Sequence, residues 1–261
     1  MKLPIGDIEI NVVDSGAPQG APVVFAHALG LDLSVWDAVV ALMPPQLRLI
    51  RFDLRGHGQS EVPPAPYTMG ALVRDAEALL DTLEVRDAVF VGNSIGGMIA
   101  QGLAVKRLDQ IRALVLSNTA AKIGQPALWA ERIAQVQRSG TGAIAAAALD
   151  KWFSPAARKT EAAQACARRV AETAAEGYTG CCAAISGTDF YTPTSGLRLP
   201  VLAIAGGHDG STPPDLVRET QLLVPGSQFA LIHRAGHLPM IDQPEAFAQR
   251  LTDFLHDIGH L

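Results

Sequence analysis

A serine lies between two glycines at the end of an apolar run. Ser94 follows Ala88–Val91, with Gly92 two positions before it and Gly96 two positions after it. A serine on a sharp turn from a strand into a helix adopts strained backbone angles, and its neighbours at these positions must be small for the chain to pass. The pattern predicts that Ser94 is a nucleophile. A glycine-rich turn with an incidental serine is the alternative.

The chain offers a base where such a serine requires one. A serine hydroxyl is a weak nucleophile at neutral pH, so it needs a base, and the base needs a carboxylate to orient it. In this arrangement the chain order is serine, acid, histidine, with the last two on loops after late strands. His237 follows the last predicted strand in a loop long enough to reach back over the sheet, whereas His233 still belongs to the strand's end. We therefore predict that His237 is the base.

Asp209 is the predicted acid. It lies in the glycine-rich loop after the apolar run Val201–Ala205. The loop after the preceding run, Ile111–Leu116, offers Asn118, which carries no negative charge. The alternative role of Asp209 is to cap the helix expected after Thr212, because aspartate is common at helix starts. The order Ser94, Asp209, His237 favours the catalytic role.

Two backbone amides are predicted to form an oxyanion hole. One donor is the amide that follows the nucleophile, and the other comes from the loop after an earlier strand. These positions are Ile95 and Leu29. Gly30 lets the backbone turn so that the Leu29 N–H faces the site. His27, in the same loop, is expected to brace it by hydrogen bonding rather than to act in catalysis.

A second loop combines charged residues with glycines. Asp53–Ser60 has the sequence DLRGHGQS and follows the apolar run Leu47–Phe52. It lacks the lysine and the following hydroxyl of a phosphate-binding loop. We therefore predict a tightly braced structural loop.

Alternating strands and helices must position these residues. Residues Ile8–Val13 alternate as in an antiparallel edge strand, and the compact apolar runs are typical of buried parallel strands. The helical segments between them imply βαβ units, so we predict an α/β fold with a mostly parallel central sheet and helices on both faces. The helical segments before the alternation stops are Leu33–Leu42, Met69–Leu83 and Gly97–Val105.

The regular alternation is interrupted from about residue 120 to residue 192. This part is alanine-rich, and its candidate helices are Ala127–Arg138, Gly142–Trp152 and Arg158–Ala175. We predict an α/β core of residues 1–119 and 193–261 and an inserted helical cap of residues 120–192. A surface decoration without a role in the site is the alternative. The core resumes with strands at Val201–Ala205 and Gln228–Ile232 and helices at Pro214–Leu223 and Pro244–Leu255.

Composition restricts the classes of partner. The 261 residues are 48% hydrophobic and carry a formal net charge of -5, without a run of basic residues. We expect no nucleic-acid partner. No apolar stretch approaches the roughly 20 residues of a membrane span, and the first residues lack a signal-peptide core, so we expect a cytoplasmic protein without a membrane partner. The three cysteines lack metal-ligand spacing, and we assign no metal and no cofactor. Whether the chain forms a homo-oligomer is left open.

The combined motifs resemble the α/β-hydrolase superfamily over essentially the whole chain. Within it, the chain is most similar to 3-oxoadipate enol-lactonases of aromatic-compound catabolism. Those enzymes often have Asn-Ser where this chain has His27-Ala28, and Leu-Ser-Met where it has Asn93-Ser94-Ile95. The resemblance implies a serine-dependent hydrolase that opens a small enol-lactone through an acyl-enzyme. The residues that carry the superfamily resemblance are His27 to Gly30, Asp53 to Ser60, Gly92 to Gly97, Asp209 and Gly236-His237. Those that carry the similarity to enol-lactonases are Leu29 to Trp36, Asn118 to Gly124, Trp152-Phe153, Glu176 to Tyr178 and Gln243 to Phe247.

An enol-lactone of this type carries a free carboxylate. Arg132, on the first helix of the expected cap, is the candidate to bind it, because a guanidinium can donate two parallel hydrogen bonds to a carboxylate. Trp152 is a candidate for the pocket wall. The alternatives are a solvated arginine and a tryptophan that fills the core of the cap.

Two other functions are compatible with these residues. One is a general carboxylesterase or a cofactor-free haloperoxidase on the same triad. The other is a hydrolase-fold protein that binds a small ligand without catalysis.

Overall fold

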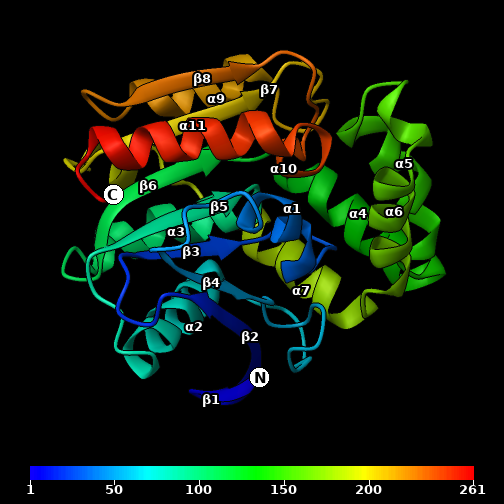
Figure 1. Ribbon diagram of the computed structural model, residues 1–261. Coiled ribbons are helices and arrows are strands. Elements are labelled where there is room, and N and C mark those ends of the chain that lie inside the picture. The colour runs from blue at the N-terminus through cyan, green and yellow to red at the C-terminus, as the bar shows by residue number, and fades with distance from the viewer.

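An eight-stranded sheet forms the centre of the computed structural model, which describes all 261 residues. The strand order is β1-β2-β4-β3-β5-β6-β7-β8 (Figure 1). β1 and β2 pair antiparallel and β2 pairs antiparallel with β4, while the remaining pairs are parallel. The predicted α/β class is confirmed. The strands are β1 Lys2–Ile5, β2 Ile8–Gly16, β3 Pro22–Ala26, β4 Arg48–Phe52, β5 Ala88–Asn93, β6 Ile111–Ser117, β7 Val201–Gly206 and β8 Gln228–Ile232.

The antiparallel strand predicted at residues 8–13 is present as part of β2, but its predicted position at the edge of the sheet was wrong. β1 pairs with β2 from Lys2↔Asn11 to Ile5↔Ile8 and takes the edge position. β1 has only four residues and contains Pro4, which cannot donate a ladder hydrogen bond. A segment this short shows too little alternation to be recognised in the sequence. The edge strand is therefore β1.

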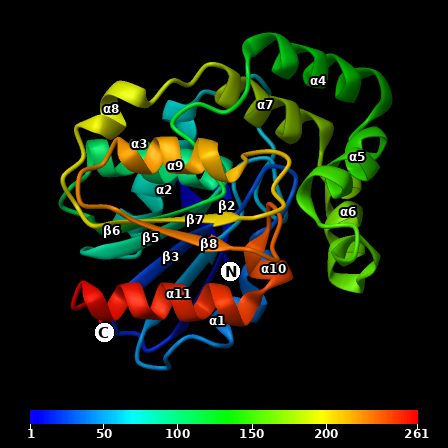
Figure 2. The same ribbon diagram turned by 90° about the horizontal axis from the view of Figure 1, so that it is seen from above.

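Helices cover both faces of the sheet (Figure 2). The 3₁₀ segment Leu33–Trp36, α1 and α11 lie on one face, and α2, α3 and α9 lie on the other. Trp36 joins β3 to α11, because its ring packs 5.2 Å from the Phe25 ring and 5.7 Å from the Phe247 ring. The bounds are α1 Asp37–Val40, α2 Met69–Thr82, α3 Ile95–Lys106, α9 Pro214–Leu222, α10 Pro239–Asp242 and α11 Pro244–Asp257.

The single helix predicted over residues 33–42 is two short pieces. Asp32 caps the 3₁₀ turn by accepting a hydrogen bond from Ser34 N. The turn then continues as α1 for only four residues. The difference follows from this local cap, which favours a tight first turn.

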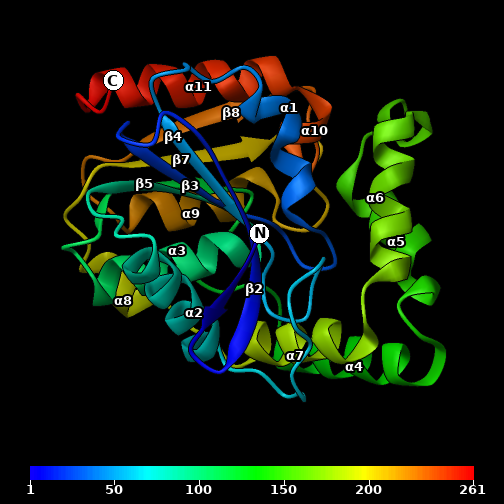
Figure 3. The same cartoon turned by 60° about the horizontal axis from the view of Figure 1, so that its bottom comes forward.

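Five helices lie between β6 and β7. Helices α4 to α7 lie beyond the carboxyl ends of the parallel strands, whereas α8 returns beside α3 (Figures 1 and 3). α4 packs against α7, and α5 packs against α6. None of the helices of the structure is both long enough and apolar enough to cross a membrane. The bounds are α4 Pro126–Ser139, α5 Gly142–Trp152, α6 Glu161–Glu172, α7 Ala175–Ser186 and α8 Tyr191–Ser195.

The continuous helix predicted over residues 158–175 was wrong. A 3₁₀ turn, Ala157–Lys159, precedes α6, and extended residues at Thr160 and Thr173 mark the two ends of α6. The Thr160 hydroxyl accepts a hydrogen bond from Ala163 N, which is an N-cap that starts a new helix. The helices α7 and α8 were not anticipated.

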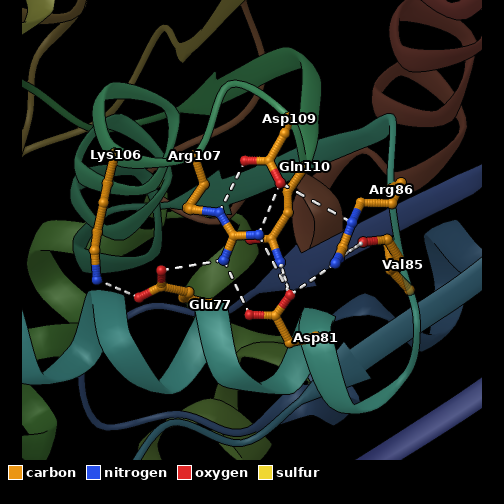
Figure 4. Close-up of polar contacts among 8 residues, drawn as sticks. All are labelled: Glu77, Asp81, Val85, Arg86, Lys106, Arg107, Asp109 and Gln110. Atoms are coloured by element: carbon orange, nitrogen blue, oxygen red, sulfur yellow. Dashed lines mark hydrogen bonds and ion pairs between the residues drawn. The ribbon is translucent and has the colours of Figure 1, made fainter.

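A cluster of ion pairs joins α2 to the end of α3 (Figure 4). The Arg107 guanidinium donates to Glu77, Asp81 and Asp109 at 2.7 to 3.3 Å. Lys106 also pairs with Glu77. These contacts hold α3 at the end opposite to Ser94.

α7 touches the core through a pair of glycines. A Cβ atom added to Gly177 would lie 2.0 Å from the Gly56 carbonyl oxygen, and Gly56 has a φ of 76°. No side chain fits between the two backbones. This contact fixes α7 against the loop that follows β4.

We expect Gly177→Ala to lower the free energy of unfolding by about 1–3 kcal/mol, because overpacking forces the backbones apart. Gly142→Ala is the control, since the added methyl group, at the start of α5, meets only Ala171 at 4.0 Å. It should leave stability unchanged or raise it by up to about 1 kcal/mol. Urea unfolding measures both variants. Equal midpoints for the two variants would contradict the close approach.

Candidate active site

Ser94 lies on a strained turn between β5 and α3. Its φ of 56° and ψ of -118° are unfavourable for a residue with a side chain. A Cβ atom on Gly92 would lie 2.2 Å from the Gly96 carbonyl oxygen, and one on Gly96 would lie 2.4 Å from the Ala26 carbonyl oxygen. Both positions therefore require glycine, as the motif predicts.

The end of β6 holds this turn in place. Ser94 N donates to the Ser117 carbonyl at 3.0 Å, and the Thr119 hydroxyl donates to the Ser94 carbonyl at 2.6 Å. The Ser94 hydroxyl itself makes no hydrogen bond within the protein. It lines a cavity of about 180 Å³ together with Leu29 and His237.

The structure brings Asp209 and His237 together. Nδ1 of His237 lies 2.8 Å from Oδ2 of Asp209, and both side chains are buried. The Asn118 amide and the Thr212 hydroxyl each donate to the same carboxylate oxygen at 2.8 Å. The Ser211 and Thr212 amides donate to the other oxygen. Asp209 therefore braces the turn before α9 and contacts the histidine, but it does not cap α9, whose N-cap is Pro213 without a side-chain bond.

Burial alone would raise the pKa of Asp209. The attraction of His237 and the hydrogen bonds from Asn118 and the Ser211 amide outweigh burial, so the pKa lies below its usual value. The carboxylate is therefore ionised at neutral pH. An ionised Asp209 can orient the imidazole and stabilise an imidazolium.

His237 is held through both its ring and its backbone. Its Nδ1 faces Asp209, and its ring stacks on that of Trp152, with centroids 5.9 Å apart and planes 22° apart. His237 N donates to the Trp152 carbonyl at 2.8 Å, and the Asn93 amide donates to the His237 carbonyl at 3.1 Å. With Nδ1 engaged, Nε2 is the ring nitrogen available to a neighbouring hydroxyl. A Ser94–His237 hydrogen bond is absent here, and such bonds often tighten only when substrate binds.

The two predicted amide donors come from the first residue of α3 and from the loop after β3. Ile95 begins α3, so its N–H has no acceptor within that helix. The Leu29 N–H has no hydrogen-bond acceptor in the protein, although the residue is buried. A donor without a partner at the cavity wall can bind a developing negative charge.

The cavity carries positive charge and no carboxylate. Its lining includes the basic residues Arg132 and Lys151 and no aspartate or glutamate. The only hydrogen bond that Arg132 makes runs from Nη1 to the Tyr178 hydroxyl at 3.1 Å. Its guanidinium is thus free of any acidic partner, and an anionic ligand could pair with it.

Trp152 lies both in the hydrophobic core and at the wall of the cavity. Its side chain is buried in the hydrophobic core, and it also lines the cavity against His237. A larger hollow of about 580 Å³ lies beside α2 and α3, but no serine or histidine lines it. The smaller cavity is therefore the one with groups suited to acyl transfer.

Three residues at the site were missed in the sequence. Asn118 carries no charge and cannot be the acid, yet its amide donates to Asp209, and its φ of 46° marks a constrained turn after β6. The Thr212 hydroxyl also donates to Asp209, and the Tyr178 hydroxyl accepts from Arg132. The only signal in the sequence for a role of Asn118 at the site is its position just after a predicted strand. Nothing in the sequence marks Tyr178 as the partner of Arg132.

Asp242 holds the loop that carries His237. Its Oδ2 accepts a hydrogen bond from Gly236 N at 2.6 Å. Burial raises the pKa of Asp242 to about 6, against the opposing effect of that hydrogen bond. In an unfolded chain an aspartate titrates near pH 4, so between about pH 4 and pH 6 the folded protein binds more protons than the unfolded one.

We therefore expect the contribution of Asp242 to the free energy of unfolding to fall as pH rises from about 4 to about 6. Asp242→Asn should remove this decline, whereas Asp253→Asn, at an exposed position of α11, should keep it. Urea unfolding at pH values from about 4.5 to about 7 measures the difference. The same pH slope in the Asp242 variant and the wild type would contradict the expectation.

Comparisons with known proteins agree with this architecture. The family model described as "Alpha/beta hydrolase family" matches residues 23–250. A 3-oxoadipate enol-lactonase of Acinetobacter baylyi is 33% identical over 92% of this chain and 91% of its own length. A pimeloyl-[acyl-carrier protein] methyl ester esterase of Vibrio vulnificus is 27% identical over 90% of this chain and 94% of its own length.

A solved structure is also similar over nearly the whole chain. The enol-lactonase of Burkholderia xenovorans superposes with a TM-score of 0.95 at 32% identity, covering 98% of this chain and all of that one. The family model spans most of the sheet, the Ser94 turn and the loop of His237. The chain belongs to the α/β-hydrolase family.

Proposed function

We propose that this protein is a serine-dependent hydrolase that opens an enol-lactone of the 3-oxoadipate type through an acyl-enzyme. The observation that carries the proposal is the cavity, which combines Ser94 and the His237–Asp209 pair with an arginine that has no acidic partner. The similarity to enol-lactonases over most of the chain supports the substrate class.

The first half of the reaction forms the acyl-enzyme. Nε2 of His237 takes the proton of the Ser94 hydroxyl, and Oγ attacks the carbonyl carbon of the lactone ring. The Leu29 and Ile95 amides donate to the oxyanion of the tetrahedral intermediate. The ring C–O bond then breaks, and the enol leaves with a proton from His237 and tautomerises to a ketone. An enolate leaves more readily than an amine, so it makes a modest demand on His237 as an acid.

The second half releases the product. His237 takes a proton from water, and the resulting hydroxide attacks the ester carbonyl, again with the two amides on the oxyanion. Collapse of this intermediate returns the proton to Ser94 and frees a second carboxylate. Asp209 remains ionised throughout and stabilises the imidazolium in both halves. Every step is carried by residues of the chain.

Recognition of the substrate is assigned to the helices between β6 and β7. We propose that residues 120–192 act as a cap, in which Arg132 binds the substrate carboxylate and Trp152 forms the wall beside His237. Tyr178 supports this role, because its hydroxyl accepts a hydrogen bond from Arg132 and leaves the other guanidinium nitrogens free. A fixed guanidinium loses little freedom when it binds an anion.

A general carboxylesterase is the second candidate. Apolar residues of the lining, such as Ile123, Leu128 and Trp129, also suit a neutral acyl group. The similarity to a methyl ester esterase supports this reading. Activity toward neutral esters alone would favour it over the enol-lactonase.

Ser94→Ala tests the nucleophile. Loss of enol-lactone absorbance should slow by about a millionfold, because the attacking oxygen is gone. A fluorophosphonate probe should label the wild type but not the variant. Ser195→Ala, at an exposed position of α8 outside the cavity, is the control and should behave like the wild type.

Other outcomes of this assay separate the candidates. Wild-type protein that cleaves short neutral esters and leaves enol-lactones intact would be a carboxylesterase. Folded wild-type protein that the probe does not label would be a ligand-binding member of the fold.

Arg132→Met tests recognition of the carboxylate. KM for the enol-lactone should rise about 10- to 100-fold, because a hydrogen bond to a charged group contributes about 1.5–3 kcal/mol. The kcat/KM for a neutral ester should change less than about threefold. Arg138→Met, on the exposed side of the same helix, should change neither value. An equal loss on both substrates would mean that Arg132 supports the fold instead.

A further inference from the structure

Two buried histidines lie behind the loop that carries Leu29. His27 follows β3 and His57 belongs to the loop after β4, and their ring centroids are 5.4 Å apart. Both are fully or almost fully buried, and neither lines the cavity with Ser94. They cannot exchange protons with substrate directly. Their contacts are with the backbone.

His27 bonds to the carbonyl just before Leu29. Its Nδ1 lies 2.8 Å from the Ala28 carbonyl oxygen, and its Nε2 lies 3.0 Å from Leu54 N. An amide N–H can only donate, so Nε2 accepts and the ring proton is on Nδ1. His27 is therefore a neutral ring that donates to Ala28.

His57 bonds to the amide just after Leu29. Its Nε2 lies 2.9 Å from Gly30 N, and its Nδ1 lies 3.1 Å from the Arg55 carbonyl oxygen. By the same reasoning, Nε2 accepts and Nδ1 donates. Burial lowers the pKa of both histidines, that of His57 to about 3, which keeps both rings neutral at ordinary pH.

These contacts fix the two peptide groups that flank the Leu29 α-carbon. The Ala28 carbonyl and the Leu29 N–H belong to one planar trans peptide and point in opposite directions. A bond that holds the carbonyl toward His27 therefore aims the N–H away from it. The next peptide contains the Gly30 N–H, which donates to His57. The loop needs such support, because Gly30 has a φ of 77° and both peptide groups would be free to rotate in an isolated loop.

We propose that His27 and His57 are positioning residues that hold the Leu29 N–H in its oxyanion-binding direction before substrate arrives. The proposal rests on the proposed function, in which Leu29 is an oxyanion donor. The two histidines act as a clamp, since each fixes one of the two peptides. Loss of either bond lets the Leu29 amide turn away without changing the position of Ser94, Asp209 or His237.

Side-chain amides of two lengths provide a test in which each position should prefer a different residue. An asparagine places its polar atoms near Nδ1 of the histidine it replaces, and a glutamine places them near Nε2. At position 27 the essential contact is the Nδ1 donor, so His27→Asn should keep function and His27→Gln should lose it. At position 57 it is the Nε2 acceptor, so His57→Gln should keep function and His57→Asn should lose it.

The readouts are the rate of labelling by a fluorophosphonate and the kcat and KM for the enol-lactone. The two unfavourable variants should lose about 10- to 100-fold in labelling rate and kcat, because removal of a whole oxyanion donor costs about 100- to 1000-fold. KM should change less than about threefold. The two favourable variants should stay within about threefold of the wild type in every value. Urea unfolding confirms that each variant compared is folded.

The results distinguish this proposal from the proposed function. If the probe labels the wild type and all four variants at equal rates, the clamp is overturned and the nucleophile is not. The same holds if all four variants lose the same factor in labelling rate. Labelled wild type without enol-lactone turnover would overturn only the substrate, and the labelling rates would still test the clamp. Folded wild type without any labelling would overturn both proposals.

If an unfavourable variant does not fold, the other position decides. The two positions predict opposite preferences between asparagine and glutamine, so either pair alone supports or overturns the clamp. A preference for the same residue at both positions would also overturn it.

Discussion

The close approach of α3 to the end of β3 is the constraint on which the site depends. Gly96 contacts the Ala26 carbonyl so closely that no side chain fits between them. This contact seats the first turn of α3 against the strand that continues into Leu29. The two predicted oxyanion donors, Leu29 and Ile95, are 66 residues apart in the chain. They follow neighbouring strands that end at the same sheet edge, because the sheet pairs Ala26 with Gly92. The strained angles of Ser94 follow from the same packing, which holds the serine where relaxed backbone would not.

Two asparagine side chains join the ends of four strands around this turn. Asn93, at the end of β5, donates to the carbonyls of Ser117 and His237. Asn118, just after β6, donates to Asp209 after β7 and to the Gly236 carbonyl after β8. A buried amide N–H is costly to leave unpaired, so each of these bonds also fixes a loop. Asp209 and His237 are therefore positioned from the same sheet edge as Ser94.

The end of α5 couples the helices over the sheet to these loops. The Trp152 carbonyl accepts from His237 N, and the Lys151 carbonyl accepts from Gly210 N. The Trp152 ring also stacks on His237 and lines the cavity. A change that moves α5 would therefore alter both the shape of the pocket and the orientation of the imidazole.

The sequence by itself determined the features that depend on neighbouring residues. Local glycine spacing and apolar patterns predict the turn at Ser94 and the loops of Asp209 and His237. They also predict most of the strands and the helices that pack on the sheet, and the structure contains these elements. Tertiary structure decided the contacts between distant segments. Examples are the hydrogen bond from Asn118 to Asp209 and the one from Arg132 to the Tyr178 hydroxyl. Another is the hydrogen bond from Gly30 N to His57. It also placed β1 at the edge and divided the helix expected at residues 158–175. Residue spacing reflects backbone geometry over a few positions, whereas these contacts arise only when packing brings together side chains that are far apart in the chain.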